Sequence, residues 1–263
     1  MTKLDVILPA GGKIDENYAR VVGTRRKPLV KFDGRTVLDR TLTTLRDSGR
    51  VGRIVLVGPD DILNHPDAAP ADVKVKEGST GPENIFRGLD SLIELGEQPE
   101  RVLICTADLP FLTVESIGAF LDKCPTNRDF CIPLIAYEDY AESYPQASAT
   151  FVTLRDGTYT TGCLFNVGTR ALQKAIHHVD QVFVNRKSKF GLARLLGWRF
   201  VALYLTKRLT IRDIEDKVME LLQCSGAAVL DSAPELAYDI DYIEDYYYAI
   251  NYLRSSRKVA AIH

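Results

Sequence analysis

Two adjacent glycines, a lysine and an aspartate are the residues of this sequence whose types could do phosphate chemistry. Gly11 and Gly12 directly follow an apolar segment, Lys27 lies downstream, and Asp108 follows a second apolar segment. Adjacent glycines carry no side chains, so the backbone can either turn sharply or come close to a ligand. The pair therefore fits a simple tight turn as well as a phosphate-binding loop, and the surrounding elements must distinguish the two.

The first half of the chain alternates predicted strands with predicted helices. Continuous apolar runs indicate buried strands at residues 4–8, 54–57 and 102–105. Helices are predicted to begin after Thr36, Gly81-Pro82 and Thr113. This alternation predicts an α/β fold with a three-layer, mainly parallel, Rossmann-like sheet. In such sheets ligands bind beyond the carboxyl ends of the strands, where Asp108 and the glycine pair lie, and this favours the phosphate-binding loop.

The second half of the chain has a less regular pattern. Residues 151–154 and 159–165 flank an Asp-Gly turn and predict a hairpin. Residues 168–224 are predicted to be mostly helical, and a last strand at 238–240 leads into a terminal helix. No linker or repeat interrupts the chain. We interpret residues 1–263 as a single domain with a helical lobe at about 168–226.

Bulk composition narrows the classes of partner. The 33 Lys and Arg residues are balanced by 35 Asp and Glu, for a net charge of −2, which lacks the basic surplus of a nucleic-acid-binding protein. No apolar run approaches the roughly 18 residues of a membrane helix, so we expect no membrane partner. Five cysteines without a C-x-x-C pair indicate small buried side chains in a reducing compartment, and the cytoplasm is the expected location.

Two common phosphate-binding loops do not match. The chain has no G-x-x-x-x-G-K-[ST] loop. A dinucleotide-binding loop needs a third glycine shortly after the first two, but the next glycine here is Gly23.

Four motifs, taken in order, are similar to those of one known family. They are Leu8-Pro9-Ala10-Gly11-Gly12 followed by Lys27-Pro28-Leu29, Glu83-Asn84-Ile85, Thr106-Ala107-Asp108-Leu109-Pro110, and Tyr238-Asp239-Ile240-Asp241. This set resembles the MobA-like nucleoside triphosphate transferases, which include molybdenum-cofactor guanylyltransferases and the cytidylyl- and uridylyltransferases of sugar and polyol phosphates. The resemblance covers residues 1–167 and 226–255. It departs from the family at Lys13 and Asp15, where a further glycine and an arginine are usual.

The resemblance implies a nucleotide-diphospho-sugar transferase type of sheet and a Mg²⁺-dependent nucleotidyl transfer from a nucleoside triphosphate to a phosphorylated small molecule, with release of pyrophosphate. It implies catalytic roles for Lys27 and Asp108. The implied nucleotide-binding residues are Leu8, Ala10, Gly11, Gly12, Lys13, Lys27, Gly81 and Asn84. The implied Mg²⁺ ligands are Asp108, Asp239 and Asp241. We expect Asp239 to act mainly on the metal, and Asp241 to cap the terminal helix as well.

A basic cluster at residues 186–194 is the expected site for the acceptor phosphate, with Lys187 and Lys189 as its ligands. A solvated helix face explains this cluster equally well. The sequence identifies neither the base nor the acceptor, and a homodimer is compatible with it.

Two alternatives remain open at the level of sequence. One is a glycosyltransferase that uses a nucleotide-sugar, although Asp108 is followed by Leu109 and Pro110 and not by the second aspartate of a D-x-D motif. The other is a nucleotide-binding regulator without catalysis, which the unusual loop after Gly12 favours.

Overall fold

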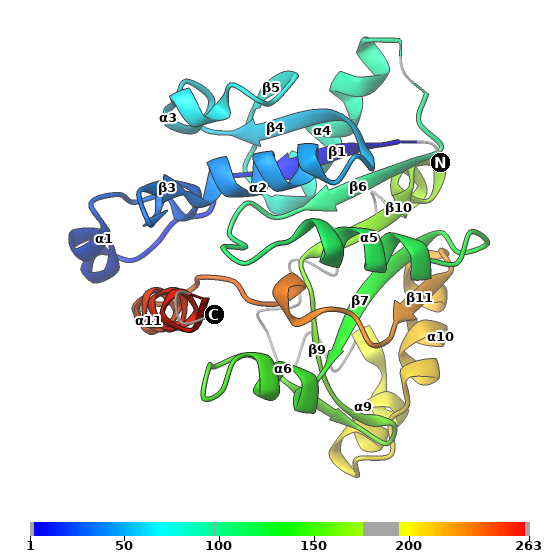
Figure 1. The fold of residues 1–263 in the computed structure, drawn as a ribbon. Coiled ribbons are helices and arrows are strands. Elements are labelled where there is room, and N and C mark those ends of the chain that lie inside the picture. Colours follow the sequence, from blue (N-terminus) through cyan, green and yellow to red (C-terminus); the bar gives the residue numbers. More distant parts are fainter. Residues whose placement is uncertain (1–2, 97, 176–194, 261–263) are drawn as a thin grey trace.

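A nine-stranded sheet forms the centre of the computed structural model, which describes residues 3–96, 98–175 and 195–260 (Figure 1). The strands are β1 (Leu4–Pro9), β4 (Val51–Gly58), β5 (Val73–Lys76), β6 (Arg101–Cys105), β7 (Phe130–Ala136), β8 (Val152–Leu154), β9 (Gly157–Thr161), β10 (Leu164–Gly168) and β11 (Gly226–Val229). Their order is β5-β4-β1-β6-β10-β7-β9-β8, and β11 pairs with β7. A separate ribbon joins β2 (Lys31–Phe32) to β3 (Arg35–Thr36).

Helices surround this sheet. They are α1 (Glu16–Val22), α2 (Val37–Asp47), α3 (Asp60–Leu63), α4 (Gly81–Glu94), α5 (Val114–Lys123), α6 (Tyr137–Ser143), α9 (Trp198–Leu205), α10 (Ile211–Leu222) and α11 (Ile243–Ala260), with short 3-10 helices at Lys27–Leu29, Pro66–Ala68 and Pro234–Leu236. Threonine side chains cap several of them: the hydroxyl groups of Thr36, Thr80 and Thr113 accept N–H bonds in the first turns of α2, α4 and α5. The helix starts predicted from sequence are confirmed at these positions.

The first half has the predicted three layers. Strand β1 lies between β4 and β6 and is parallel to both. Its Ile7 packs with Leu89 and other buried residues in a cluster that includes α4, whereas Leu8 packs with Leu38 in a cluster that includes α2 and α5. Successive residues of a strand point to opposite faces, so a continuous apolar run fills both layers. The predicted α/β fold is therefore confirmed.

The second half is mixed, with antiparallel pairs around β10 and β9. The hairpin with its Asp-Gly turn is confirmed as β8 and β9. The predicted strand at 159–165 is divided, because the chain leaves β9 at Gly162, where a Cβ atom would lie 2.8 Å from the carbonyl oxygen of Leu236. Strands β7 and β11 were not predicted.

The predicted strand at 238–240 is wrong. Residues 238–240 belong to no strand and follow the 3-10 helix Pro234–Leu236 as an unpaired segment. Helices α9 and α10 lie within the range expected for a helical lobe, and the division into one domain with a lobe stays an interpretation of the sequence.

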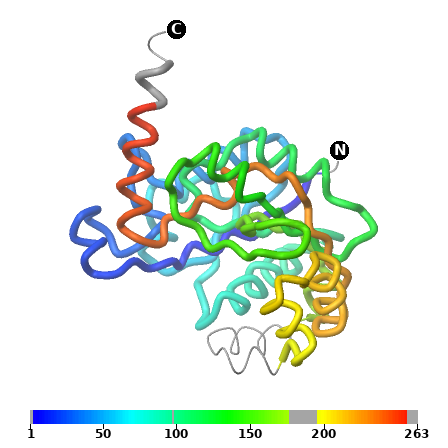
Figure 2. The backbone as a smooth tube through the Cα atoms, turned by 90° about the horizontal axis from the view of Figure 1, so that it is seen from below, coloured from blue at the N-terminus to red at the C-terminus, as the bar shows by residue number. Residues whose placement is uncertain are grey.

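Helix α1 was not predicted, and it occupies part of the long connection between Gly12 and Lys27. Asp15 begins it by accepting the N–H groups of Asn17 and Tyr18, and Gly23 ends it with a positive φ of 75°. The ring of Tyr18 is fully buried, with its centroid 5.9 Å from that of Tyr246. The connection therefore packs against α11, which extends away from the body of the molecule (Figure 2).

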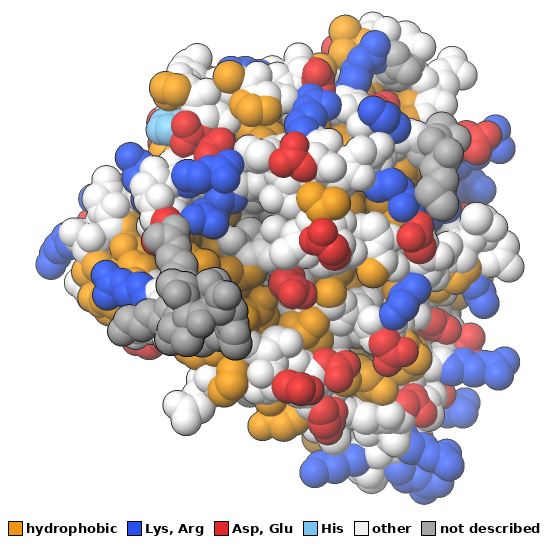
Figure 3. All heavy atoms as spheres, viewed as in Figure 1, with side chains coloured by type: hydrophobic (Ala, Val, Ile, Leu, Met, Phe, Trp, Pro, Cys, Tyr) orange, Lys and Arg blue, Asp and Glu red, His pale blue; other side chains and the backbone are white. Residues whose placement is uncertain are grey.

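Charged side chains of both signs are interspersed on the face that Figure 3 shows. All five cysteines are free, and Cys105, Cys131 and Cys224 are buried. Among the described residues, no helix is both long enough and apolar enough to span a membrane.

Candidate functional site

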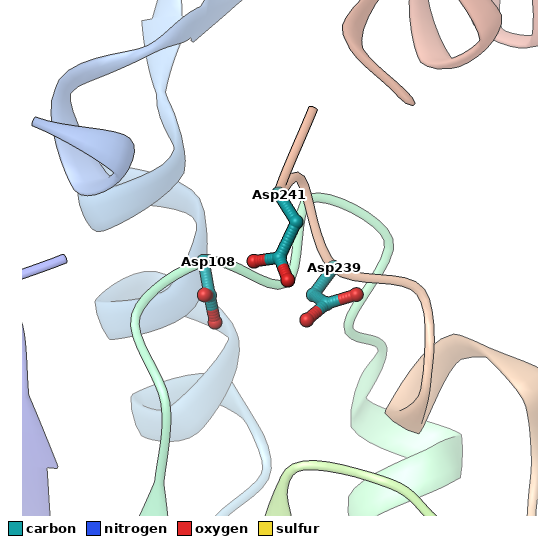
Figure 4. A group of neighbouring side chains, drawn as sticks. All are labelled: Asp108, Asp239 and Asp241. Carbon is teal, nitrogen blue, oxygen red and sulfur yellow. The ribbon is translucent and has the colours of Figure 1, made fainter. Parts of the chain in front are cut away.

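Three aspartates from distant parts of the sequence converge at one point. Asp108 follows β6, and Asp239 and Asp241 lie between the 3-10 helix Pro234–Leu236 and α11. One carboxylate oxygen from each lies within 4.8 Å of the others, and Figure 4 shows the three side chains facing a common space. We call Asp108, Asp239 and Asp241 the acidic trio.

Buried neighbours hold the two later aspartates in place. Tyr238 and Ile240 are almost fully buried, so the segment is anchored by every second residue. Side chains alternate along an extended segment, which places Asp239 and Asp241 together on the other side. This is the arrangement expected for a strand, although no neighbouring strand supports it.

Lys27 lies next to the trio. Its ammonium nitrogen is 3.3 Å from Oδ2 of Asp108 and donates a hydrogen bond to Oδ1 of Asp241. Burial disfavours the charged form of Lys27, but Asp108 and Asp241 outweigh it and raise the pKa of this lysine. The lysine therefore stays positively charged and supplies part of the charge that the trio requires.

Asp239 is both partly buried and close to two other carboxylates. Burial, followed by the charges of Asp108 and Asp241, raises the pKa of Asp239 to about 7. Lys27 pairs with Asp108 and Asp241, and one ammonium does not balance three carboxylates, so the cluster keeps an excess of negative charge when all are ionised. A cluster of this kind favours a bound cation.

The donor set fits a hard divalent cation. Oδ1 of Asp108 is buried without a hydrogen-bond partner among the described residues, which is costly for a carboxylate unless something else satisfies it. Mg²⁺ binds oxygen ligands and commonly takes one or two carboxylates together with substrate phosphates. Asp108, Asp239 and Asp241 are the residues that would hold it.

The expected capping role of Asp241 is wrong. Its carboxylate pairs with Lys27, and the N–H of Tyr242 at the start of α11 donates instead to Asp245, at 2.8 Å. Asp245 is buried and also accepts a hydrogen bond from Ser148. All three members of the trio are therefore free of helix capping.

The glycine loop lies between the trio and the end of β4. The backbone N–H of Lys27 donates to the carbonyl oxygen of Gly12 at 3.0 Å, and a Cβ atom on Gly12 would lie 3.2 Å from Cδ of Lys27. The lysine side chain thus runs directly over this glycine. Lys13, which was expected to contact the nucleotide, is exposed on the same loop.

One expected nucleotide contact needs correction. The N–H of Ala10 donates to the carbonyl oxygen of Val57 at 2.7 Å, so it is not available to a phosphate. Sequence alone could not show that the N–H of Ala10 is already bonded, because this depends on the residue at which β1 stops pairing with β4. The side chain of Leu8 is fully buried in the core, and its contact with a nucleotide stays a prediction.

Gly81 and Asn84 shape the neighbouring loop. Gly81 is the first residue of α4, and Oδ1 of Asn84 accepts the N–H of Gly78 at 2.6 Å. Asn84 is buried and positions the loop between β5 and α4. Its direct contact with a nucleotide stays a prediction.

Arg26 and Glu77 lie beside the glycine loop and were not among the residues singled out from the sequence. The guanidinium of Arg26 lies 2.8 Å from Asp61, 3.4 Å from the carbonyl oxygen of Gly11 and 4.0 Å from Glu77. A Cβ atom on Gly11 would overlap the carboxylate of Glu77, so this side chain would have to move if Gly11 were replaced. The only local signal was the place of Arg26 directly before Lys27.

Lys187 and Lys189, the expected acceptor ligands, lie outside the described residues. The structure instead shows a cavity of about 560 Å³ next to the trio, and Asp239 and Asp241 belong to its wall.

Comparison with known proteins gives the family. The model of the MobA-like NTP transferase domain matches residues 6–149, which include the glycine loop, Lys27 and Asp108. The chain belongs to the MobA-like NTP transferase family. This agrees with the resemblance of its motifs.

The chain is 31% identical over 108 residues to phosphoenolpyruvate guanylyltransferase of Sphaerobacter thermophilus, covering 41% of this chain and 49% of that protein. It is 24% identical over 136 residues to 2-C-methyl-D-erythritol 4-phosphate cytidylyltransferase of Vibrio vulnificus, covering 49% and 54%. The chain thus matches about half the length of these relatives.

Solved structures extend the likeness to the second half of the chain. A hypothetical transferase from Thermus thermophilus has a TM-score of 0.82 and 28% identity, covering 93% of this chain and 99% of that one. The 4-diphosphocytidyl-2C-methyl-D-erythritol synthase of Anaerococcus prevotii has a TM-score of 0.58 and 16% identity, with 96% of both chains covered, and shares the fold.

Proposed function

We propose that this protein is a Mg²⁺-dependent nucleotidyltransferase that moves a nucleoside monophosphate from a nucleoside triphosphate to a phosphorylated small molecule. The observation that carries the proposal is the convergence of the acidic trio and Lys27 beside the glycine loop. Family membership and the relatives, which are named as guanylyl- and cytidylyltransferases, support the same reaction.

In the proposed reaction, a phosphate oxygen of the acceptor attacks the α-phosphorus of the triphosphate. The bond from the α-phosphorus to the oxygen that bridges to the β-phosphate breaks, and pyrophosphate leaves with that electron pair. Charge moves onto phosphate oxygens throughout, so catalysis depends on cations and N–H donors already in position.

Each part of the site has a role in this reaction. Gly11 and Gly12 bring backbone N–H groups close to the triphosphate, and Lys27 neutralises charge that develops as pyrophosphate leaves. Asp108, Asp239 and Asp241 hold the metal. Mg²⁺, when bound, neutralises phosphate oxygens and orients them. The backbone N–H of Lys27 donates to the carbonyl oxygen of Gly12, and this bond holds the lysine at a fixed position relative to the glycine loop.

Release of pyrophosphate tests the proposal. The protein is incubated with Mg²⁺ and each of the four triphosphates in turn, with a set of phosphorylated acceptors. We expect release with one preferred base, a loss of about a hundredfold or more in Lys27→Ala and Asp108→Asn, and an unchanged rate in Lys31→Ala, an exposed lysine of β2. Equal turnover in Asp108→Asn and the unmodified protein would exclude the proposed site.

The same experiment separates the two alternatives. A glycosyltransferase consumes a nucleotide-sugar without pyrophosphate release. A non-catalytic regulator binds Mg²⁺ and triphosphate, and calorimetry detects this binding while no pyrophosphate forms.

A further inference from the structure

The cavity beside the acidic trio is bounded by two apolar faces. Along β7, Phe130, Ile132 and Leu134 point into the cavity, while the alternate residues Cys131, Pro133 and Ile135 are buried on the other face of the sheet. Helix α10 faces them with Ile214 and Val218. Two such faces normally close on each other to exclude water.

Two hydrogen bonds attach helix α10 to the strands that surround the cavity. The N–H of Ile211, at the start of α10, donates to Asp156 of the β8–β9 turn at 2.7 Å. On the other side, the N–H of Ala228 in β11 donates to Glu215 of α10 at 2.9 Å. None of the residues of α10 is buried, although one side of the helix is strongly apolar. Helix α10 is thus attached to the strands by these two hydrogen bonds, and its apolar side lines the cavity between them.

Charge is distributed unevenly along this cavity. Asp239, Asp241 and Asp245 belong to its lining. Glu215 of α10 lines it too, and its carboxylate accepts a backbone N–H of β11. No Lys or Arg lines it among the described residues. A phosphate in the apolar part would be buried without a counter-ion, at a large free-energy cost. A phosphate therefore belongs at the trio, where Lys27 and the metal neutralise it.

We propose that the acceptor is an amphiphilic phosphate monoester, with its phosphate at the acidic trio and a predominantly hydrocarbon body in the cavity. This inference rests on the proposed function and names its substrate class. The phosphate attacks the α-phosphorus as described above, and the hydrocarbon body undergoes no reaction. A polyol body would place hydroxyl groups against the side chains of Ile132, Ile214 and Val218, which offer no hydrogen-bond partner, although Thr160 and Thr161 also line the cavity.

A series of n-alkyl phosphates tests the substrate class. Methyl, butyl, octyl and dodecyl phosphate are compared with sugar and polyol phosphates, by calorimetry with Mg²⁺ and by pyrophosphate release. We expect affinity to rise about fourfold for each methylene that enters the cavity, the fold-change that corresponds to about 0.8 kcal/mol. Affinity that does not change with chain length, together with turnover of a polyol phosphate, would overturn the inference and leave nucleotidyl transfer intact.

Variants of the wall locate the hydrocarbon body. In Ile214→Asp, the affinity for octyl phosphate should fall at least roughly tenfold more than that for methyl phosphate, because a carboxylate then faces the chain. Met219→Asp, on the exposed side of the same helix, is the matched control and should keep the preference for long chains. Ala228→Phe, which fills the cavity from β11, should shorten the longest chain bound.

The binding results also distinguish failure of this inference from failure of the proposed function. Chain-length-dependent binding that Ile214→Asp abolishes, without pyrophosphate release from any triphosphate, would support the cavity as a hydrocarbon site and contradict the transfer reaction. Octyl phosphate binding of equal strength in Ile214→Asp, Ala228→Phe and the unmodified protein would contradict the cavity assignment.

Discussion

At the scale of single residues, the acidic trio combines two opposing demands. The carboxylates must be close enough to hold one cation, and closeness raises their mutual repulsion. Lys27 offsets part of this repulsion for Asp108 and Asp241, whereas Asp239 is the member whose pKa burial and its neighbours raise to about 7. Residues arranged for binding often reduce the stability of the ligand-free protein.

We therefore predict that Asp239→Asn stabilises the metal-free protein and abolishes its response to Mg²⁺. Asparagine removes a charge that burial, Asp108 and Asp241 all disfavour. Thermal unfolding at pH 8 in EDTA should show a higher Tm than for the unmodified protein, and added Mg²⁺ with triphosphate should no longer raise it. Asp90→Asn, on the exposed side of α4, is the control. A lower Tm for Asp239→Asn than for the unmodified protein in EDTA would contradict the view that the charge of Asp239 is unfavourable in the metal-free protein.

The residue scale also shows what sequence could predict. Gly11, Gly12 and Asp108 follow strands directly, so a local pattern was sufficient to place them at one sheet edge. Asp241 was expected to cap α11 from an equally local pattern. That expectation failed because Lys27, 214 residues away in sequence, bonds the same carboxylate. A short motif does not show whether a carboxylate will bond to the nearby helix or to a residue that is distant in the sequence.

At the scale of elements, α1 shows how an inserted segment is fixed to the body. Tyr18 is the buried residue of α1. Its ring packs against Tyr246 of α11 within a cluster of aromatic side chains. The hydroxyl oxygen of Tyr18 is buried and has no hydrogen-bond partner among the described residues. The ring is therefore stabilising, whereas its hydroxyl group is not.

This difference predicts opposite effects for two substitutions. Tyr18→Phe should raise the free energy of unfolding by about 1 kcal/mol, because an unpaired buried hydroxyl is removed. Tyr18→Ala should lower it by about 3–5 kcal/mol through the cavity that it leaves. Urea denaturation monitored by circular dichroism measures both. If Tyr18→Phe were as destabilised as Tyr18→Ala, the hydroxyl group would have to be bonded in solution.

Elements that sequence did not predict share one cause. Strands β7 and β11 depend on pairing across about a hundred residues of chain, and residues 238–240 have a strand-like pattern without any strand beside them. The spacing of apolar residues predicts that a segment is buried. It does not predict which other strand, if any, pairs with that segment. The hairpin of β8 and β9 was predictable because its turn residues are local.

At the scale of the whole molecule, the site spans a seam between two halves. β6 is parallel to β1 on one side and antiparallel to β10 on the other. Asp108 comes from the first half, and the other two members of the trio come from the second. Arg101 spans this seam, with hydrogen bonds to the side chain of Asn166 at 2.8 Å and to the carbonyl oxygen of Arg128 at 2.7 Å.

Arg101→Met should loosen this seam. The free energy of unfolding should fall by about 2 kcal/mol, since charge-assisted bonds are removed and their acceptors lose a partner. Lys74→Met, an exposed position of β5, should leave it unchanged within about 0.5 kcal/mol. Guanidinium denaturation compares the two variants. Equal stability of Arg101→Met and Lys74→Met would show that β6 and β10 hold the halves together without this side chain.

The double attachment of Lys27 has a consequence for how ligands enter. Its backbone N–H is hydrogen-bonded to the glycine loop, and its ammonium pairs with carboxylates of both halves. The lysine thus supplies positive charge at the trio in the absence of a metal ion. In the proposed reaction, a metal that binds the trio would replace a counter-ion that is already in place, at a site that is already assembled. The ammonium of Lys27 would then be available to the phosphates of the triphosphate beside the glycine loop. Preorganisation of this kind lowers the entropy lost when ligands bind.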